Sequence, residues 1–359
     1  MTATGRRIFS LDAGRKYFSL EELKTLVAKA AQLGYTDIHL LLGNEGLRFV
    51  LDDMSLEVAG QSYPHDAVVE AIRIGNECYY AEDNGRYLTE GELTSLIHQA
   101  AELGLGFIPA INSPGHMNAM LTAMEHLGVE SPRHHYGDMT SRQTLDLDNE
   151  VACAFVKELL SKYLVYFRDK SDYFTIGADE FANDLYVEAA AAKGITNGFS
   201  ALQQAGEYKN FIAYVNDLAS LVKSFGMTPI VFNDGFYFAG DTTYPLDKDV
   251  MISYWTSGWE GYDVAKPALL HQRGHVLLNT SDKWYHVLGR LVEEDGFYHV
   301  AQTKAGVAQV PLDQLPSQEP GEIPQWGAMF AVWSDQPEKE YQEAIILELM
   351  EDFARNFEK

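Results

Sequence analysis

The sequence Tyr-Phe-Thr-Ile-Gly-Ala-Asp-Glu-Phe, residues 173–181, contains the features that decide the fold. Its first four residues are aromatic or β-branched and favour a strand. Gly177 and Ala178 are small, so a ligand or a second backbone can approach closely. Asp179 and Glu180 follow directly. An apolar strand that ends in two acids places charge at the mouth of a parallel sheet or barrel, where α/β folds keep their sites.

The acid pair itself indicates acid–base chemistry. When two carboxylates lie close together in a partly dry pocket, one tends to stay ionised while the other keeps its proton, which divides the roles of acid and base between them. The pair alone is weak evidence, because Asp and Glu are also common at solvated turns that follow strands. The rest of the chain has to decide between a solvated turn and a site.

Length and composition favour one large domain with a neutral ligand. The chain has 359 residues, of which 46% are hydrophobic, and an α/β barrel can use this length as a single domain. We therefore expect residues 1–359 to form one barrel with loop insertions. Lys and Arg total 27 against 52 Asp and Glu, which gives a formal net charge of −25. Such a surface repels phosphate backbones and anionic membranes, so nucleic acid is not an expected partner.

Two further features concern the compartment. The two cysteines, Cys78 and Cys153, lack metal-type spacing and say little about the compartment, but their scarcity excludes a scaffold built on disulfides. No run is apolar enough to span a bilayer, and residues 1–10 do not resemble a signal peptide. Two locations stay open: the cytoplasm, or an excised domain of a longer secreted or cell-surface enzyme. The oligomeric state is not predicted.

Apolar runs alternate with helical periodicity about eight times along the chain. The predicted strands cover residues 6–11, 37–42, 106–111, 173–176, 228–232, 250–254, 275–278 and 327–332. The predicted helices cover residues 20–33, 89–103, 151–167, 208–225, 264–272 and 338–357. Residues 45–84 do not fit the alternation and are expected to form loops and short pieces. The pattern predicts an α/β fold, a closed (β/α)8 TIM barrel wrapped in helices.

Polar and aromatic residues recur just after the predicted strands. They are Arg15, His116, Asp179, Glu180, Asp234, Trp255, Tyr285 and Asp335. Because the carboxyl ends of barrel strands converge on one face, these residues are predicted to line one pocket. Aromatic rings of Trp255, Trp333 and Tyr285 would stack on the C–H faces of a sugar, while Arg and Asp bind its hydroxyls. A core position is the better interpretation for each tryptophan taken alone, but Trp255 and Trp333 both follow strand ends, which favours the pocket.

With these residues in this order, the chain resembles the catalytic domains of the family 20 glycoside hydrolases, the β-N-acetylhexosaminidases. Within that family it is most similar to the exo-β-N-acetylglucosaminidase domains of streptococcal surface enzymes. The similarity covers nearly the whole chain and rests on ordered motifs. These motifs are Asp12-Ala-Gly-Arg15-Lys-Tyr-Phe, His39-Leu-Leu-Leu-Gly-Asn44, Ile111-Asn-Ser-Pro-Gly-His116-Met, Gly177-Ala-Asp179-Glu180, Phe232-Asn-Asp234-Gly-Phe-Tyr, Ile252-Ser-Tyr-Trp255, Trp284-Tyr285 and Val332-Trp333-Ser-Asp335.

The resemblance implies exo-acting hydrolysis of terminal β-linked N-acetylglucosamine, with N-acetylgalactosamine as a further possible substrate. The mechanism implied is substrate-assisted retention, in which the 2-acetamido oxygen attacks the anomeric carbon and forms an oxazolinium intermediate. Glu180 would be the general acid and then the base, Asp179 would orient the acetamido N–H, and Tyr285 would hold its oxygen. No metal or organic cofactor is needed.

The resemblance also implies the remaining substrate contacts. Arg15 and Asp335 would bind hydroxyls at the non-reducing end, and Trp255 and Trp333 would wall the sugar. His116 would lie behind Glu180 and tune its proton affinity. Asp234 is expected to line the same pocket.

Three positions depart from the pattern of many family members. Thr175 stands where many have His, Ala178 where many have Gly, and Asn112 where many have Asp. If a buried Asp normally supports His116, Asn112 supports it less well. None of the three changes removes a proposed catalytic group.

Two other functions stay open from the sequence. A conventional two-carboxylate retaining glycosidase would also cleave sugars that lack the 2-acetamido group, and a non-catalytic carbohydrate-binding barrel would bind without cleaving. A phosphate-binding barrel lacks a Gly-rich phosphate loop, and a serine hydrolase lacks the G-x-S-x-G motif. The loop pair His134-His135 and the segment Ala189–Ala192 are expected to carry no chemistry.

Overall fold

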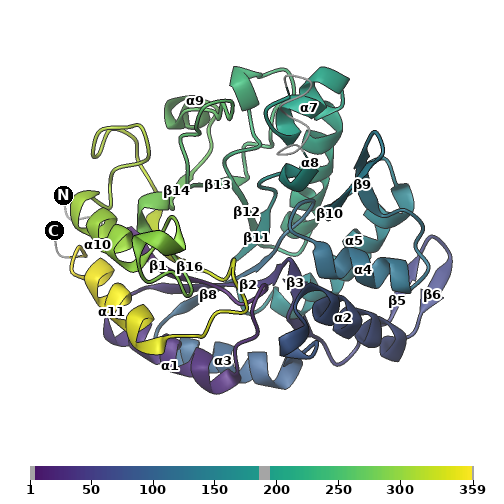
Figure 1. Ribbon diagram of the computed structural model, residues 1–359, viewed down its shortest axis with the longest axis horizontal. Coiled ribbons are helices and arrows are strands. Elements are labelled where there is room, and N and C mark those ends of the chain that lie inside the picture. The colour runs from purple at the N-terminus through teal and green to yellow at the C-terminus, as the bar shows by residue number, and fades with distance from the viewer. Residues whose placement is uncertain (1–4, 186–194, 358–359) are drawn as a thin grey trace.

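The computed structural model describes residues 5–185 and 195–357 and contains a closed barrel of parallel strands (Figure 1). The barrel strands are β1 (Arg6–Asp12), β2 (Asp37–Asn44), β8 (Gly106–Ile111), β11 (Tyr173–Gly177), β12 (Thr228–Phe232), β13 (Met251–Tyr254), β14 (Leu277–Asn279) and β16 (Gly327–Trp333). Each pairs in parallel with the next, and β1 pairs with both β2 and β16, which closes the ring. The predicted (β/α)8 TIM barrel is confirmed.

Helices surround this barrel, and short strands extend its loops. The helices are α1 (Leu20–Gln32), α2 (His65–Tyr79), α3 (Glu90–Glu102), α4 (Asn118–His126), α5 (Glu150–Phe167), α7 (Gly198–Ala205), α8 (Tyr208–Ser224), α9 (Pro267–Gln272), α10 (Val300–Gln309) and α11 (Glu343–Ala354). The short strands are β3 (Gly46–Leu47), β4 (Phe49–Val50), β5 (Leu56–Val58), β6 (Gln61–Tyr63), β7 (Leu88–Thr89), β9 (Arg133–Tyr136), β10 (Met139–Leu145) and β15 (Tyr285–Val287). Helices α1 and α11, from opposite ends of the chain, lie side by side outside the barrel (Figure 1).

The helices that the sequence predicts best are those with capping signals. Helix α1 begins after Ser19, whose hydroxyl accepts from the backbone N–H of Glu22 while the Glu22 carboxylate accepts from the backbone N–H of Ser19. Thr89 and Glu92 form the same reciprocal pair at the start of α3. These bonds satisfy backbone donors that a helix start leaves free, so the boundaries are encoded locally.

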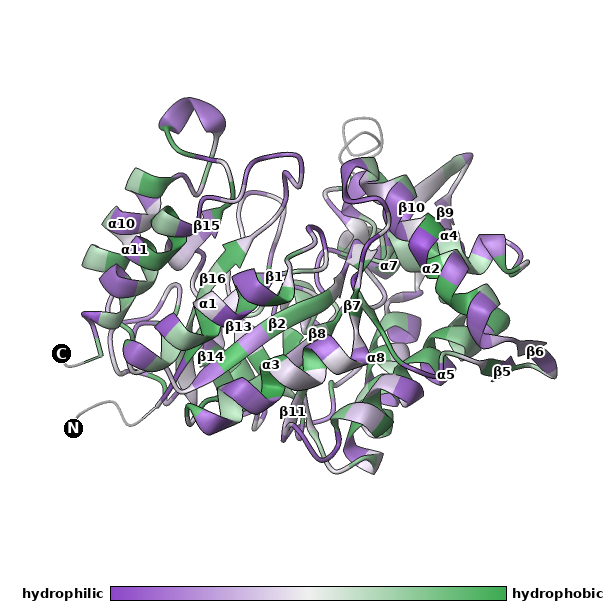
Figure 2. Cartoon of the chain, turned by 90° about the horizontal axis from the view of Figure 1, so that it is seen from below, coloured by the Kyte–Doolittle hydropathy of each residue, from purple (hydrophilic) through white to green (hydrophobic). Residues whose placement is uncertain are grey.

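The core lies in two places, as expected for strands that are buried on both faces. A large cluster fills the space between strands and helices, and a smaller one fills the barrel interior. The interior cluster consists of Ile8, Ile108, Ile230, Phe232, Met251, Leu278 and Met329. Figure 2 shows hydrophobic residues along the barrel strands and hydrophilic residues on the outward faces of the surrounding helices.

Several helices were not predicted. The expectation of loops and short pieces for residues 45–84 is wrong for α2, which has 15 residues and packs against α4, also missed. Helix α2 follows Pro64 with no side-chain cap, and α10 likewise begins after an uncapped residue, His299. In α10 only Thr303 and Val307 are buried, so its apolar stripe is too thin to recognise.

The connection from β12 to β13, residues 233–250, departs from strict strand–helix alternation. It contains only the 3-10 turn Phe238–Gly240 and no α-helix. Its first residues, Asn233 and Asp234, are fully buried. The start of this loop therefore packs inward at the mouth of the barrel, where it supports the residues described below.

Three sequence expectations concern features away from the barrel mouth. His134 and His135 lie on strand β9, paired with β10, and not in a loop as predicted. The segment Ala189–Ala192 lies outside the described residues. Across residues 5–185 and 195–357, no helix is both long enough and apolar enough to cross a lipid bilayer.

Candidate active site

The carboxyl ends of the barrel strands surround one cavity. Its lining residues are Arg15, Asn44, His116, Asp179, Glu180, Phe232, Trp255, Tyr285, Val287, Tyr298, Trp333 and Asp335. Eight of the nine predicted site residues are among them, although they come from six different strand ends. The ninth, Asp234, is buried beneath the cavity and does not line it.

The acid pair sits on an unusual turn after β11. Gly177 has φ 83°, Ala178 φ 63° and Glu180 φ 49°, so the backbone enters the left-handed region three times within four residues. This conformation costs little for Gly and more for other residues. Such a turn is retained only where the surrounding structure holds it, and its effect here is to place Asp179 and Glu180 side by side in the cavity wall.

Position 177 has no room for a side chain, because a Cβ atom there would lie 2.1 Å from Oδ1 of the buried Asn112. We expect Gly177→Ala to lower the free energy of unfolding by about 3–4 kcal/mol. The matched control is Gly104→Ala, which has φ 78° and no atom within 4 Å of the new Cβ, and should cost about 1–2 kcal/mol. Urea unfolding measures both, and equal losses would contradict the collision.

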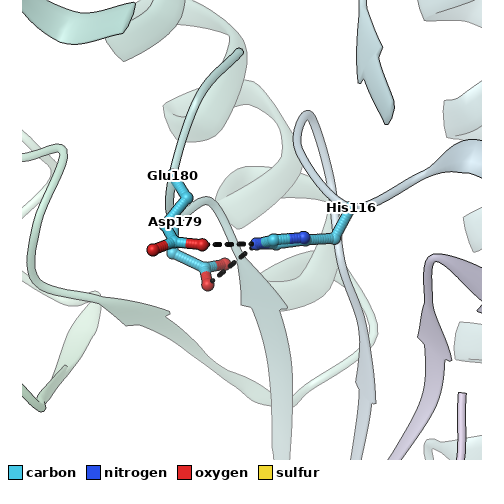
Figure 3. Close-up of side chains that lie close together, drawn as sticks. All are labelled: His116, Asp179 and Glu180. Carbon is cyan, nitrogen blue, oxygen red and sulfur yellow. Dashed lines mark ion pairs between the residues drawn. The ribbon is translucent and has the colours of Figure 1, made fainter. Parts of the chain in front are cut away.

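His116 connects the acid pair to a third carboxylate. Its Nε2 lies 3.4 Å from Oδ2 of Asp179 and 3.4 Å from Oε2 of Glu180, and Figure 3 shows the ring edge directed at both side chains. Its Nδ1 lies 2.9 Å from Oε1 of Glu45. Asn112 donates to Asn44 at 3.0 Å. The carboxylate in contact with His116 Nδ1 is therefore Glu45, while the side chain of Asn112 is bonded to Asn44.

These contacts determine the charge of His116. Burial lowers the pKa of the imidazole, but the charges and hydrogen bonds of Asp179, Glu180 and Glu45 together outweigh burial and raise the pKa well above its usual value. The three carboxylates thus favour the protonated imidazole, while burial and the Arg15 guanidinium, whose Nη2 lies 3.3 Å from Nδ1, oppose it. A protonated imidazole donates two hydrogen bonds and offers no lone pair to a metal. Although His116, Asp179 and Glu180 are close enough together to contact one ion, their chemistry fits an ion-paired network better than a metal site.

The raised pKa of His116 predicts how stability depends on pH. Its stabilising contribution is complete below the unfolded pKa of about 6.5 and is lost as pH rises through the higher folded pKa. The difference in Tm between the native chain and His116→Gln should therefore be largest near pH 6 and shrink toward alkaline pH. His98→Gln, at an exposed position of α3, is the matched control for the substitution itself. A difference for His116→Gln that grew with pH would refute the assignment of charge.

Asp179 offers an unused acceptor. While its Oδ2 faces His116, its Oδ1 is buried and has no hydrogen-bond partner among the described residues. Leaving a buried carboxylate oxygen without a donor costs free energy, so this atom is prepared for a donor that arrives with a ligand. An amide N–H is the kind of group that would satisfy it.

The guanidinium of Arg15 lies beside His116, with its Nη2 3.3 Å from His116 Nδ1. Nη1 of Arg15 donates to Oδ2 of Asp12 at 2.9 Å and lies 3.4 Å from Oδ1 of Asp335. Asp12 is fully buried and also accepts from the backbone N–H groups of Gly14 and Arg15. Asp12 therefore fixes the guanidinium, while the carboxylate of Asp335 is 41% exposed and available to a ligand.

Aromatic rings form the remaining wall. The ring of Tyr285 stacks on Trp255 with centroids 6.3 Å apart and meets Trp333 edge-on at 5.3 Å. Burial raises the pKa of the Tyr285 phenol well above its usual value, so it stays a neutral donor. The indole N–H of Trp333 is buried with no acceptor among the described residues. The wall thus combines flat apolar faces with one free donor, the indole N–H of Trp333, and both suit a pyranose.

Sequence reasoning missed some residues of the site. Glu45 directly follows β2, so the strand-end pattern that identified the other residues applies to it as well. It was missed because residues 45–84 were expected to form only loops and short pieces. Tyr298 also lines the cavity but precedes helix α10 in a long connection, where the sequence gives no positional signal. Phe232 and Val287 read as ordinary strand residues.

Comparison with known proteins agrees with this fold. Residues 6–347 match the catalytic domain of glycosyl hydrolase family 20. The chain therefore belongs to glycosyl hydrolase family 20. A catalytic module of the pneumococcal exo-β-D-N-acetylglucosaminidase StrH superposes with a TM-score of 0.93 at 45% identity, covering 98% of this chain and 83% of that one. Dispersin B shares the fold, with a TM-score of 0.70 at 17% identity, covering 99% of this chain and 98% of that one.

Curated relatives are more distant. A lacto-N-biosidase from Bifidobacterium bifidum is 30% identical over 208 residues, which is 55% of this chain. A beta-hexosaminidase from Akkermansia muciniphila is 27% identical over 244 residues, which is 65% of this chain. The matched regions span 17% and 46% of these two proteins, so the chain corresponds to less than half the length of either.

Proposed function

We propose that this chain hydrolyses terminal β-linked N-acetylhexosamine, chiefly N-acetylglucosamine, from the non-reducing end of glycans. The observation that carries the proposal is the buried Oδ1 of Asp179 in the cavity wall, which has no hydrogen-bond partner among the described residues and lies beside Glu180. A 2-acetamido sugar supplies the missing N–H donor, and glucose does not. The pneumococcal relative, an exo-β-D-N-acetylglucosaminidase, and the beta-hexosaminidase relatives support the same substrate class.

The first chemical step would use the substrate's own amide as the nucleophile. Glu180 donates its proton to the glycosidic oxygen as the C1–O bond breaks, and the acetamido oxygen bonds to C1 to give an oxazolinium ion. Asp179 accepts the acetamido N–H and stabilises the positive charge that develops on the ring. The Tyr285 hydroxyl donates to the acetamido oxygen and holds it in line with C1.

The second step would restore the enzyme. The ionised Glu180 takes a proton from water, the resulting oxygen nucleophile attacks C1, and the oxazolinium ring opens. Two displacements at C1 leave the β configuration unchanged. The cation of His116 between Asp179 and Glu180 keeps the two carboxylates at fixed positions through both steps.

The rest of the cavity would bind the sugar. Arg15 and Asp335 form a pair that recognises hydroxyls at the non-reducing end, because a guanidinium and a carboxylate together offer fixed donors and acceptors. Trp255 and Trp333 cover the acetamido group and the ring. The scheme requires no metal or organic cofactor.

Hydrolysis of two chromogenic β-glycosides tests this function. The native chain should release p-nitrophenol from the N-acetylglucosaminide and leave the glucoside intact, because only the first carries the internal nucleophile. Cleavage of both sugars would favour a conventional two-carboxylate glycosidase. Binding of N-acetylglucosamine without cleavage of either glycoside would favour a carbohydrate-binding barrel.

A further inference from the structure

Among the nine predicted site residues, Asp234 is the one with no exposed surface. It follows β12, one residue after Asn233, and lies beneath the cavity wall. A carboxylate in such a place is expensive unless donors surround it. The identity of those donors shows what the residue does.

Three donors converge on the Asp234 carboxylate from two other segments. Its Oδ2 accepts from the backbone N–H of Glu180 at 2.9 Å and from the hydroxyl of Tyr262 at 2.7 Å. Its Oδ1 accepts from the indole N–H of Trp255 at 3.1 Å. One buried side chain therefore joins the turn that carries the acid to the segment that carries the aromatic wall.

The bond to Glu180 acts on a strained point of the backbone. Glu180 has φ 49°, a conformation that side chains other than Gly rarely adopt. Because its backbone N–H is held by Asp234, the peptide plane before Glu180 is fixed, and with it the direction in which the side chain leaves the turn. The neighbouring Asn233 holds Trp255 from the other side, since its Oδ1 accepts from the Trp255 backbone N–H at 2.8 Å.

The electrostatic environment of Asp234 fits the same role. Burial, followed by the charges of Asp179 and Glu180, raises the pKa of the Asp234 carboxyl to about 7, while the hydrogen bonds from Glu180 and Tyr262 oppose the rise. A substrate hydroxyl has no access to it. The charges of the acid pair repel the Asp234 carboxylate and make this position unfavourable for it. Its presence is explained by its hydrogen bonds to groups that contact the sugar.

We infer that Asp234 is a positioning residue that sets the direction of Glu180 and the plane of Trp255 relative to each other. This corrects the expectation that Asp234 lines the pocket. The inference rests on the proposed function for its kinetic consequences, and on the geometry alone for its effect on Trp255.

The main test is Asp234→Asn, which keeps the shape of the side chain. The Asn side chain has only one oxygen. When this oxygen accepts from Glu180 and Tyr262, the new NH2 group faces the indole N–H of Trp255, which then has no acceptor there. We expect kcat to fall about 10²-fold on a methyl N-acetylglucosaminide and about 10-fold on the p-nitrophenyl glycoside. The difference arises because a misplaced Glu180 slows the departure of a poor leaving group most. Asp249→Asn, an exposed residue of the same connection, should leave both rates unchanged.

A spectroscopic readout separates this inference from the proposed function. In ¹⁵N-edited NMR spectra, the indole N–H signal of Trp255, assigned by its loss in Trp255→Phe, should move upfield in Asp234→Asn as its acceptor is lost. An inactive native chain in which this signal still moves would overturn the function and leave the positioning of Trp255 intact. Equal losses of kcat on both glycosides with an unmoved indole signal would overturn the positioning role.

Tyr262→Phe covers the case in which Asp234→Asn does not fold. It removes one donor and leaves the bonds from Glu180 and Trp255 in place. We expect a several-fold fall in kcat on the methyl glycoside, a smaller fall on the p-nitrophenyl glycoside, and an indole signal shifted in the direction opposite to that in Asp234→Asn, because the carboxylate then binds Trp255 more strongly. Unchanged kinetics and an unchanged signal would overturn the inference.

Discussion

Replacement of Glu180 with Gln is expected to lower kcat on an alkyl N-acetylglucosaminide by about 10³- to 10⁴-fold. The amide has the same shape as the carboxyl group but neither donates a proton to the departing oxygen nor takes one from water. The contact of Glu180 with His116 Nε2, at 3.4 Å, can be kept by the amide oxygen, so the fold should survive. Michaelis–Menten kinetics on the purified variant measure the effect.

The leaving group provides an internal check on this result. A p-nitrophenolate departs without a proton, so the first step on that glycoside should be slowed much less by Glu180→Gln than the same step on the alkyl glycoside. Glu158→Gln, on the exposed face of α5, is the matched control and should change neither rate. An alkyl glycoside cleaved by Glu180→Gln at the native rate would assign the acid role to another group.

Replacement of Asp179 with Asn is expected to lower kcat by about 10²- to 10³-fold, with a smaller change in KM. The Asn oxygen should stay toward the cationic His116, as Asp179 Oδ2 does at 3.4 Å. Its NH2 group then takes the place of the buried Oδ1, so an acceptor for the acetamido N–H becomes a donor. The negative charge that stabilises the oxazolinium ion is lost as well. Steady-state kinetics on the N-acetylglucosaminide test both effects together.

The control for this variant lies on the same strand. Asp172 is exposed and immediately precedes β11, at the end of the strand opposite to Asp179. Asp172→Asn should leave kcat unchanged. It tests whether the loss of one negative charge near β11 is by itself enough to lower kcat. A native rate for Asp179→Asn would remove the acetamido-binding role from this residue.

Much of the fold and of the site could be predicted because both depend on local patterns. Strands buried on both faces appear in the sequence as continuous apolar runs, and barrel closure brings their carboxyl ends together whatever the loops do. That is why Arg15 and Asp335, 320 positions apart in the numbering, could be assigned to one pocket before the ion pair between them was seen. Capped helices such as α1 were predicted to within one residue.

The parts that were not predicted depend on tertiary contacts. Helix α2 has no side-chain cap and is stabilised by packing on α4, which a single window of sequence does not reveal. The position of Asp234 relative to the cavity is set by donors from Tyr262 and Glu180, 28 and 54 positions away, so sequence reasoning placed it in the wall when it lies beneath. The contact between His116 and Glu45 joins residues 71 positions apart, so it was not predicted from the sequence either.

The most direct test of the central claim uses a series of p-nitrophenyl N-acyl-β-glucosaminides in which the acetyl methyl group carries zero, one, two or three fluorine atoms. Fluorine withdraws electrons from the acetamido oxygen and changes the rest of the substrate little. If that oxygen attacks C1, kcat/KM of the native chain should fall steeply with each fluorine. A value that stays flat across the series would show that the acetamido oxygen is not the nucleophile and would contradict substrate assistance.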